Sequence, residues 1–238
     1  MEDIDAIALL QDPVRRRLYE FVAARGGEVG RNEAAEAAGV GRTLAAFHLD
    51  KLVGAGLLEA GSRRLTGRSG PGAGRPAKVY RRSAGERGVS FPARDYVTAA
   101  GLLAEAAEAA GLDAEVRDAA RRRGRSLAGA GGPCGGLGEF EGVLARRGYE
   151  PVREGSAGGA AVVRMRNCPF HVVAEAFPPL VCGMNLALLE GMAEGVEGVR
   201  VRMDARPGWC CAVVEEALEE AAAGSPPPPP PPSKNNQD

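Results

Sequence analysis

The sequence predicts a mainly α protein with an α+β part, and two observations lead to this fold class. Apolar residues recur at helical spacing through much of the 238-residue chain, and short strand-like runs gather near residue 70 and again after residue 148. Hydrophobic residues make up 45% of the chain and charged residues 26%, which provides enough apolar material for two modest cores.

The first helices are predicted from the residues at their ends. Asp3 to Leu10 and Pro13 to Arg25 indicate a broken first helix, in which Asp12 caps the second piece and Pro13 takes its first position. Arg31 to Ala38 then predicts a short Ala-rich helix. The glycines that follow it suit a tight turn between two helices.

The second helix of this pair and an exit strand are predicted between Val40 and Glu59. Ala45, Leu49 and Leu52 fall at helical spacing and would pack inward. The opposite face begins with a forked arginine donor and a hydroxyl, groups that contact base edges when a helix lies in a DNA groove. The outward side chains are Arg42, Thr43, Ala46, Phe47, Asp50 and Lys51.

A basic hairpin is predicted after this helix. Two strand-like ends flank a loop rich in Gly and Pro, and the segment from Leu58 to Arg87 has eight basic and two acidic residues, a net charge of +6 in a chain whose net charge is −1. Positive charge concentrated in this way indicates a phosphate-binding surface. The candidate contacts on the hairpin are Arg63, Arg64, Arg68, Arg75 and Lys78. His48, on the helix, is either a further contact to the DNA backbone or a partly buried residue.

The run AAFHLDKLVGAGLLE followed by GRPAKVY resembles the winged helix-turn-helix of ArsR-type bacterial transcriptional regulators. The resemblance implies a DNA-binding domain at residues 1–85 and double-stranded DNA as a partner. It also implies a homodimer, because a two-fold protein matches a two-fold operator. It does not imply the signal that is sensed, because this module is joined to many sensors.

Three further parts are expected beyond the hairpin: a helical linker and dimerisation region at 86–130, an α+β domain at 131–216 and a disordered proline-rich tail at 217–238. The linker would contain helices from Asp95 to Ala110 and from Asp113 to Ala128, and we place the dimer contact on the first of these and on the N-terminal helix. No apolar run reaches the roughly 18 residues that cross a bilayer, and the N-terminus lacks the form of a secretory signal. A cytoplasmic protein without a membrane partner is therefore expected.

Secondary structure in the third part is predicted to alternate. We expect helices at 139–147, from about 170, and at 179–195, and strands at 149–153, 160–166, 199–204 and 210–214. Cysteines lie at the boundaries between these elements, in NCPFH, LVCGMN and PGWCC. Loop ends and helix N-termini can converge on one point and offer free backbone donors to bound thiolates.

Thiolates are soft ligands that favour iron–sulfur clusters, zinc or copper(I). Three cysteines and a fourth donor would suit a Cys-ligated 4Fe–4S cluster or a tetrahedral zinc site with three cysteines and one histidine. The candidate ligands are Cys168, His171, Cys182, Cys210 and Cys211. Widely spaced cysteines after a winged N-terminal domain resemble the sensor domain of SufR-type regulators, in which three such cysteines hold an iron–sulfur cluster. The doubled Cys210-Cys211 and the nearby His171 depart from that pattern and leave the third and fourth donors open.

Two other interpretations stay open. Scattered thiols can be core residues, and the protein would then be a winged-helix regulator that senses a small organic ligand, with structural cysteines or zinc. An enzyme is not expected, because the sequence has no Ser/His/Asp set, paired acidic motif or cofactor-binding glycine pattern, and only Cys168 with His171 resembles a nucleophile and its base. The sequence thus predicts a transcriptional regulator that binds an iron–sulfur cluster or metal through its C-terminal cysteines and alters operator binding.

Overall fold

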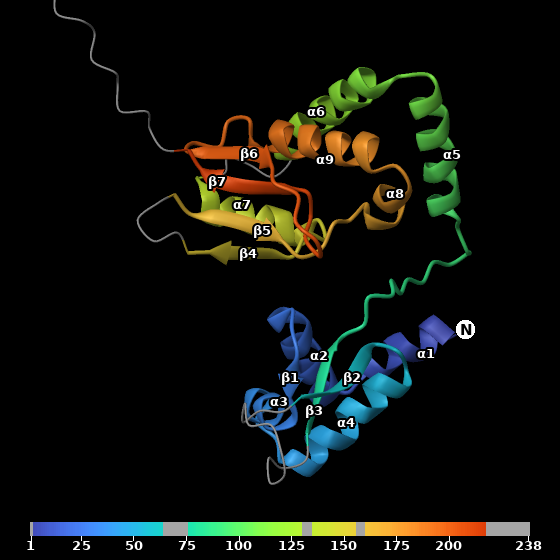
Figure 1. Ribbon diagram of the computed structural model, residues 1–238, viewed down its shortest axis with the longest axis vertical. Helices are drawn as coiled ribbons and strands as arrows, with labels where there is room; N and C mark the ends of the chain where they lie inside the picture. Colours follow the sequence, from blue (N-terminus) through green and yellow to red (C-terminus); the bar gives the residue numbers. More distant parts are fainter. Residues whose placement is uncertain (1, 64–75, 130–134, 156–159, 218–238) are drawn as a thin grey trace, which may run out of the picture. The chain divides into compact units, whose positions relative to one another are not determined.

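The computed structural model describes residues 2–63, 76–129, 135–155 and 160–217, which form a mixed α and β structure with two small antiparallel sheets (Figure 1). The chain divides into two compact units, Met1–Arg94 and Asp95–Asp238. The expected contacts Arg64, Arg68 and Arg75 and nearly all of the tail expected at 217–238 lie outside the described residues.

The first unit is built from helices packed on a three-stranded sheet, whose strand order is β1-β3-β2. Its elements are α1 (Glu2–Ala8), a 3-10 turn (Leu9–Gln11), α2 (Pro13–Arg25), β1 (Val29–Gly30), α3 (Arg31–Ala38), α4 (Arg42–Gly54), β2 (Leu58–Arg63) and β3 (Ala77–Arg82). The broken first helix, the short third helix and the two hairpin strands agree with the sequence predictions. The Asp12 carboxylate accepts hydrogen bonds from the backbone N–H groups of Val14 and Arg15, which caps α2 as expected.

The core of the first unit lies among α2, α3, α4 and the sheet. Leu18 and Val22 of α2, Leu49 and Leu52 of α4 and Tyr80 of β3 are almost fully buried in it. Gly39 ends α3 with a φ of +65°, a left-handed conformation that glycine adopts without strain, and its backbone N–H bonds back to α3. This cap turns the chain sharply into α4 and sets the angle at which α4 leaves α3.

The second unit contains a four-stranded antiparallel sheet in the order β4-β5-β7-β6, with helices on one face. Its elements are α5 (Tyr96–Ala109), α6 (Asp113–Gly129), α7 (Leu137–Arg146), β4 (Pro151–Glu154), β5 (Val162–Met165), α8 (His171–Ala176), α9 (Pro178–Ala193), β6 (Val199–Met203) and β7 (Ala212–Glu216). Phe140 and Leu144 of α7, Leu189 of α9, and Val163 and Met165 of β5 form the core between the helices and the sheet.

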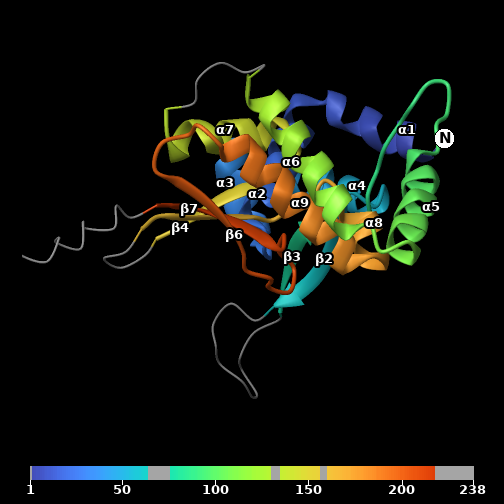
Figure 2. The ribbon, with the colours of Figure 1, turned by 90° about the horizontal axis from the view of Figure 1, so that it is seen from above.

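The division between the two units falls at Arg94, inside the region 86–130 that was expected as a linker, so that α5 and α6 belong to the second unit. Helices α6 and α9 lie side by side in both views (Figure 1, Figure 2). Gly124 of α6 and Gly191 of α9 each face the backbone of the other helix, where a Cβ atom would overlap. Two ion pairs, Arg121 with Glu190 and Arg125 with Glu194, link the same helices.

Candidate metal centre and nucleic-acid interface

The outward face of α4 carries the polar and aromatic groups that the sequence placed there. Arg42 and Thr43, at the first positions of the helix, are exposed, and the side chain of Phe47 is 53% exposed. The ammonium group of Lys51 lies 4.7 Å from the centroid of the Phe47 ring. An exposed helix start with a guanidinium and a hydroxyl has the donors needed to contact base edges.

A concave surface lies between the start of α4 and the hairpin, and it encloses a volume of about 1010 Å³. Four cationic side chains line it, together with Glu33 and small residues: Arg31, Arg42, Arg63 and Lys78. They come from α3, α4, β2 and β3, so separate segments contribute positive charge to one hollow. Such a surface suits a phosphate backbone.

Two of these candidate contacts are already ion-paired. Lys78 Nζ lies 2.7 Å from Asp50 Oδ1, and the Tyr80 hydroxyl donates to the same oxygen over 2.9 Å. Partial burial alone would raise the pKa of Asp50, but these two hydrogen bonds outweigh it and lower that pKa. Arg63 lies 3.5 Å from Glu28. The net positive charge of the concave surface is therefore smaller than a count of its basic residues suggests.

His48 points away from the outward face of α4. Its side chain is buried, and its Nδ1 accepts a hydrogen bond from Arg15 Nε over 3.3 Å. Position 48 follows Ala45 by three residues and precedes Leu52 by four, so it shares their inward face. The sequence left two roles open for His48, a contact to the DNA backbone or partial burial, and the side chain is buried in the structure.

The second candidate site gathers four cysteines of the second unit. Cys168 lies between β5 and α8, Cys182 in the second turn of α9, and Cys210 and Cys211 directly before β7. Cys210 is buried and the other three are partly buried. Residues separated by more than forty positions are thus brought together by the pairing of β5 with β7.

The thiols interact with one another, and this shifts their pKa values. The pKa of Cys168 lies well above its ordinary 9.0, chiefly because of its interaction with the Cys210 side chain and its burial. The pKa of Cys211 is raised by its interaction with Cys210, by burial and by Cys182. The pKa of Cys210 is lowered because Cys168, Cys211 and Asn185 all stabilise its thiolate. The neighbouring side chains therefore stabilise negative charge on Cys210 more than on Cys168 or Cys211.

The chemistry of the donor set fits a soft metal centre. Within the described ranges, no three His, Cys, Asp or Glu side chains already converge around a single point as a finished metal site. The interactions instead link the thiols in the order Cys168, Cys210, Cys211 and Cys182. Four thiolates from such a set would match the ligand count of a 4Fe–4S cluster or a tetrahedral zinc ion.

His171 takes no part in these interactions. It begins α8, its side chain is 61% exposed, and its Nε2 lies 3.2 Å from Glu175 Oε1 one helical turn later. The spacing between Cys168 and His171 suggested a shared metal, but the structure places Cys211 beside the other thiols and the imidazole at the surface.

Sequence reasoning missed two polar residues next to the thiols. Tyr149 Oη donates to Asn185 Oδ1 over 2.5 Å, and Asn185 Nδ2 donates to Cys210 Sγ over 3.3 Å. Burial raises the pKa of Tyr149, and the nearby thiols Cys210, Cys168 and Cys211 raise it further. The one available signal was the position of Asn185, one helical turn after Cys182.

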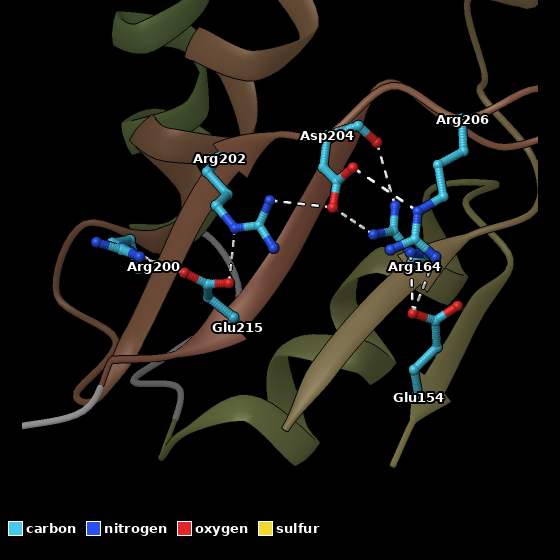
Figure 3. Close-up of polar contacts among 7 residues, drawn as sticks. All are labelled: Glu154, Arg164, Arg200, Arg202, Asp204, Arg206 and Glu215. Carbon is cyan, nitrogen blue, oxygen red and sulfur yellow. Dashed lines mark hydrogen bonds and ion pairs between the residues drawn. The ribbon is translucent and has the colours of Figure 1, made fainter. Parts of the chain in front are cut away.

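The loop between β6 and β7, which carries Cys210 and Cys211, is anchored by an ion-pair network on the sheet face opposite the helices (Figure 3). Arg164 of β5 is 1% exposed, and its guanidinium pairs with Asp204 in this loop and, over 3.0 Å, with Glu154 of β4. Arg206 in the same loop lies 3.5 Å from Glu154. The backbone N–H of Asp204 also donates to the carbonyl of Cys211 over 2.8 Å. The network thereby holds in place the backbone that carries Cys210 and Cys211.

No family model, curated protein or solved structure matches the chain. Across residues 2–63, 76–129, 135–155 and 160–217, every helix falls short of the length or the apolar character that crossing a lipid bilayer demands.

Proposed function

We propose that this protein is a DNA-binding transcriptional regulator in which Cys168, Cys182, Cys210 and Cys211 hold an iron–sulfur cluster. The observation that carries the proposal is the chain of pairwise interactions that links four thiols from three separate segments of the second unit. Cys210 belongs to the hydrophobic core of this unit, and Cys168 and Cys211 pack against that core. Each of these cysteines also interacts with another thiol, which an isolated core cysteine would not do. Partial exposure of three of them leaves a route for iron and sulfide to enter.

The first unit supports the DNA-binding half of the proposal. Helices α2, α3 and α4 are followed by the β2–β3 hairpin, and α4 exposes Arg42 and Thr43 at its start. This order of elements supports the proposal of a winged helix-turn-helix. In this proposal α4 lies in the major groove of double-stranded DNA, and the hairpin contacts phosphates beside it. The concave basic surface between them is where the DNA backbone would pass.

We also propose that the protein is a cytoplasmic homodimer that associates through α5. Tyr96 and Leu103 are both 73% exposed and lie seven residues apart, so they share one face of the helix. Leu102, 62% exposed, widens this apolar strip. A second copy of the chain would cover it, and Leu103→Glu is expected to convert dimers to monomers in sedimentation velocity. Wild-type protein that sediments as a monomer would contradict this.

Coupling between the two functions would run through α8. This helix lies between Cys168 and Cys182 and packs against α5 (Figure 1). A bound iron–sulfur cluster supplies a centre whose assembly and loss follow the supply of iron and the presence of oxidants. Drawing the four sulfur atoms to one point would move α8 and with it the proposed dimer helix. This movement would act as a switch only if the cluster-bound and the cluster-free protein differ in their affinity for DNA.

The deciding experiment is the visible absorption spectrum of protein purified without oxygen, together with its iron, sulfide and zinc content. We expect a brown protein with equal iron and sulfide. Cys182→Ser and Cys211→Ser should lose the colour while keeping the fold, and His171→Ala should keep both. A colourless wild type with one zinc per chain would replace the cluster by a zinc site. A metal-free wild type would refute the metal centre.

DNA binding is tested separately, by fluorescence anisotropy with operator and random duplexes. Arg42→Ala is expected to weaken operator binding by roughly 1–3 kcal/mol and to affect random DNA much less, because a bidentate base contact carries sequence information. Equal weakening on both duplexes would contradict the placement of α4 in the major groove.

A further inference from the structure

A buried amide lies next to the proposed cluster ligands. Asn185 is fully buried in α9 and follows Cys182 by three residues, so the same side of the helix presents a ligand and this amide. Its Nδ2 donates to Cys210 Sγ over 3.3 Å. A fully buried amide costs free energy unless its donor and acceptor are both satisfied.

Tyr149 satisfies the other end of the amide. Its side chain is 3% exposed, and its hydroxyl donates to Asn185 Oδ1 over 2.5 Å. The backbone N–H of Tyr149 bonds to the carbonyl of Leu144 at the end of α7, which fixes the start of this chain of hydrogen bonds. Because the hydroxyl occupies Oδ1, the NH₂ group of Asn185 must face the sulfur.

The sulfur of Cys210 lies in a fixed setting. The backbone N–H of Cys210 donates to the carbonyl of Met165 over 2.8 Å, which ties this residue to β5. An N–H group aimed at a metal-bound thiolate stabilises its negative charge, holds the ligand in place and favours the reduced form of an iron–sulfur cluster. Among the cysteines of the described residues, Cys210 is the most deeply buried, so water competes least for this hydrogen bond.

We propose that Asn185 is a positioning residue that acts through Cys210, with Tyr149 setting the direction of its amide. Together they orient the Cys210 thiolate toward the bound metal centre and raise the reduction potential of that centre. This inference rests on the proposed cluster site and adds to it two residues, from α9 and from the segment before β4.

The test uses the full-length protein, reconstituted without oxygen with ferrous iron and sulfide. Asn185→Leu removes the donor at similar size, Asn185→Asp puts a carboxylate beside the thiolate, and Tyr149→Phe removes only the hydroxyl. Met184→Leu is the control on the same helix. The readouts are the midpoint potential in a dye-monitored titration, the rate of cluster loss to an iron chelator and the melting temperature.

We expect the midpoint potential to fall in the order wild type, Tyr149→Phe, Asn185→Leu and Asn185→Asp, with Met184→Leu equal to wild type. Loss of a group that supports a metal ligand typically weakens metal binding about 10- to 100-fold, so cluster loss should be about 10-fold faster in Asn185→Leu and about 100-fold faster in Asn185→Asp. A lower melting temperature with unchanged potential and unchanged rate of loss would overturn the inference and leave the cluster site standing. Wild-type protein that takes up no iron and no sulfide would overturn both.

Discussion

Gly191 of α9 faces the backbone carbonyl of Arg121 of α6 so closely that a Cβ atom in place of its hydrogen would lie within 3.0 Å of that oxygen. Gly124 approaches the backbone of Leu188 and Met192 in the same way. The two helices can pack at this distance only because neither side chain is present. Since α9 also carries Cys182 and Asn185, this packing fixes one side of the proposed metal centre.

Gly191→Ala should therefore destabilise the second unit. The new methyl group meets backbone, which cannot rotate away, and overpacking of this kind typically costs about 1–3 kcal/mol. Urea denaturation followed by circular dichroism should show a lower midpoint with an unchanged slope. Gly183→Ala on the same helix meets only the flexible side chain of Arg117 at 3.6 Å. This control should be neutral or stabilising by up to about 1 kcal/mol, because alanine favours helix.

Removal of the Arg164 guanidinium is expected to be costly. Its side chain is 1% exposed and pairs with carboxylates on both sides, so Arg164→Met leaves Glu154 and Asp204 with fewer partners. Breaking a buried ion pair typically costs about 3–5 kcal/mol, which calorimetry of the variant can measure. Arg200, whose side chain is 66% exposed, also pairs with a carboxylate. For Arg200→Met we expect a loss of about 0–1 kcal/mol in the free energy of unfolding. An equal loss in Arg200→Met and Arg164→Met would contradict the role of burial in the stabilisation by Arg164.

Acid should weaken the same sheet face through Glu215. Burial opposes ionisation of this carboxyl group, but the guanidinium groups of Arg200 and Arg202 outweigh it and lower its pKa below the ordinary 4.5. A lowered pKa in the folded state contributes stability that is fully present above the ordinary value and is lost as pH falls through the folded value. Glu215→Gln should make the loss of stability below pH 4.5 shallower. Urea midpoints measured as a function of pH would show this difference. The same fall in midpoint below pH 4.5 for Glu215→Gln and the wild type would contradict the prediction.

Asp50→Asn should strengthen binding to any DNA sequence. The carboxylate places a negative charge beside the proposed phosphate-binding surface and pairs with Lys78 over 2.7 Å. The amide removes that charge but can still accept the hydrogen bond from Tyr80. With Lys78 released to a phosphate, the slope of log affinity against log salt should steepen by about one. Lys78→Gln, measured in the same titration, should weaken binding; tighter binding by Lys78→Gln would place the DNA elsewhere.

Elements with strong local signals could be predicted from the sequence. The Asp12-Pro13 start of α2, the glycine after α3 and the Gly/Pro-rich break between β2 and β3 all act within a few residues, and the structure places the elements there. Strand β1 has only two residues, Val29 and Gly30, and exists because β3 pairs with it. A segment so short has no periodicity to detect.

The parts of the candidate site that escaped prediction depend on distant contacts. Asn185 accepts a hydrogen bond from Tyr149, which is 36 positions away in the sequence, and Arg164 donates to Asp204, which is 40 positions away. No local sequence pattern predicts either contact. Arg164 in particular has the composition of a surface residue, and only the network around it accounts for its burial. The sequence singled out the cysteines at 168, 182 and 210 because Pro, Gly and Asn beside them indicated element boundaries; their role as metal ligands stays a prediction.

Strand β7 lies between β5 and β6 in the sheet, although it follows both of them in the chain. During synthesis on the ribosome, β5 and β6 would therefore emerge before β7, the strand that lies between them in the finished sheet. Cys210 and Cys211 immediately precede that strand and arrive with it. A nascent or prematurely terminated chain that ends before residue 210 has only Cys168 and Cys182 of the proposed ligands, so the metal centre would be completed only at the final step of folding of this unit.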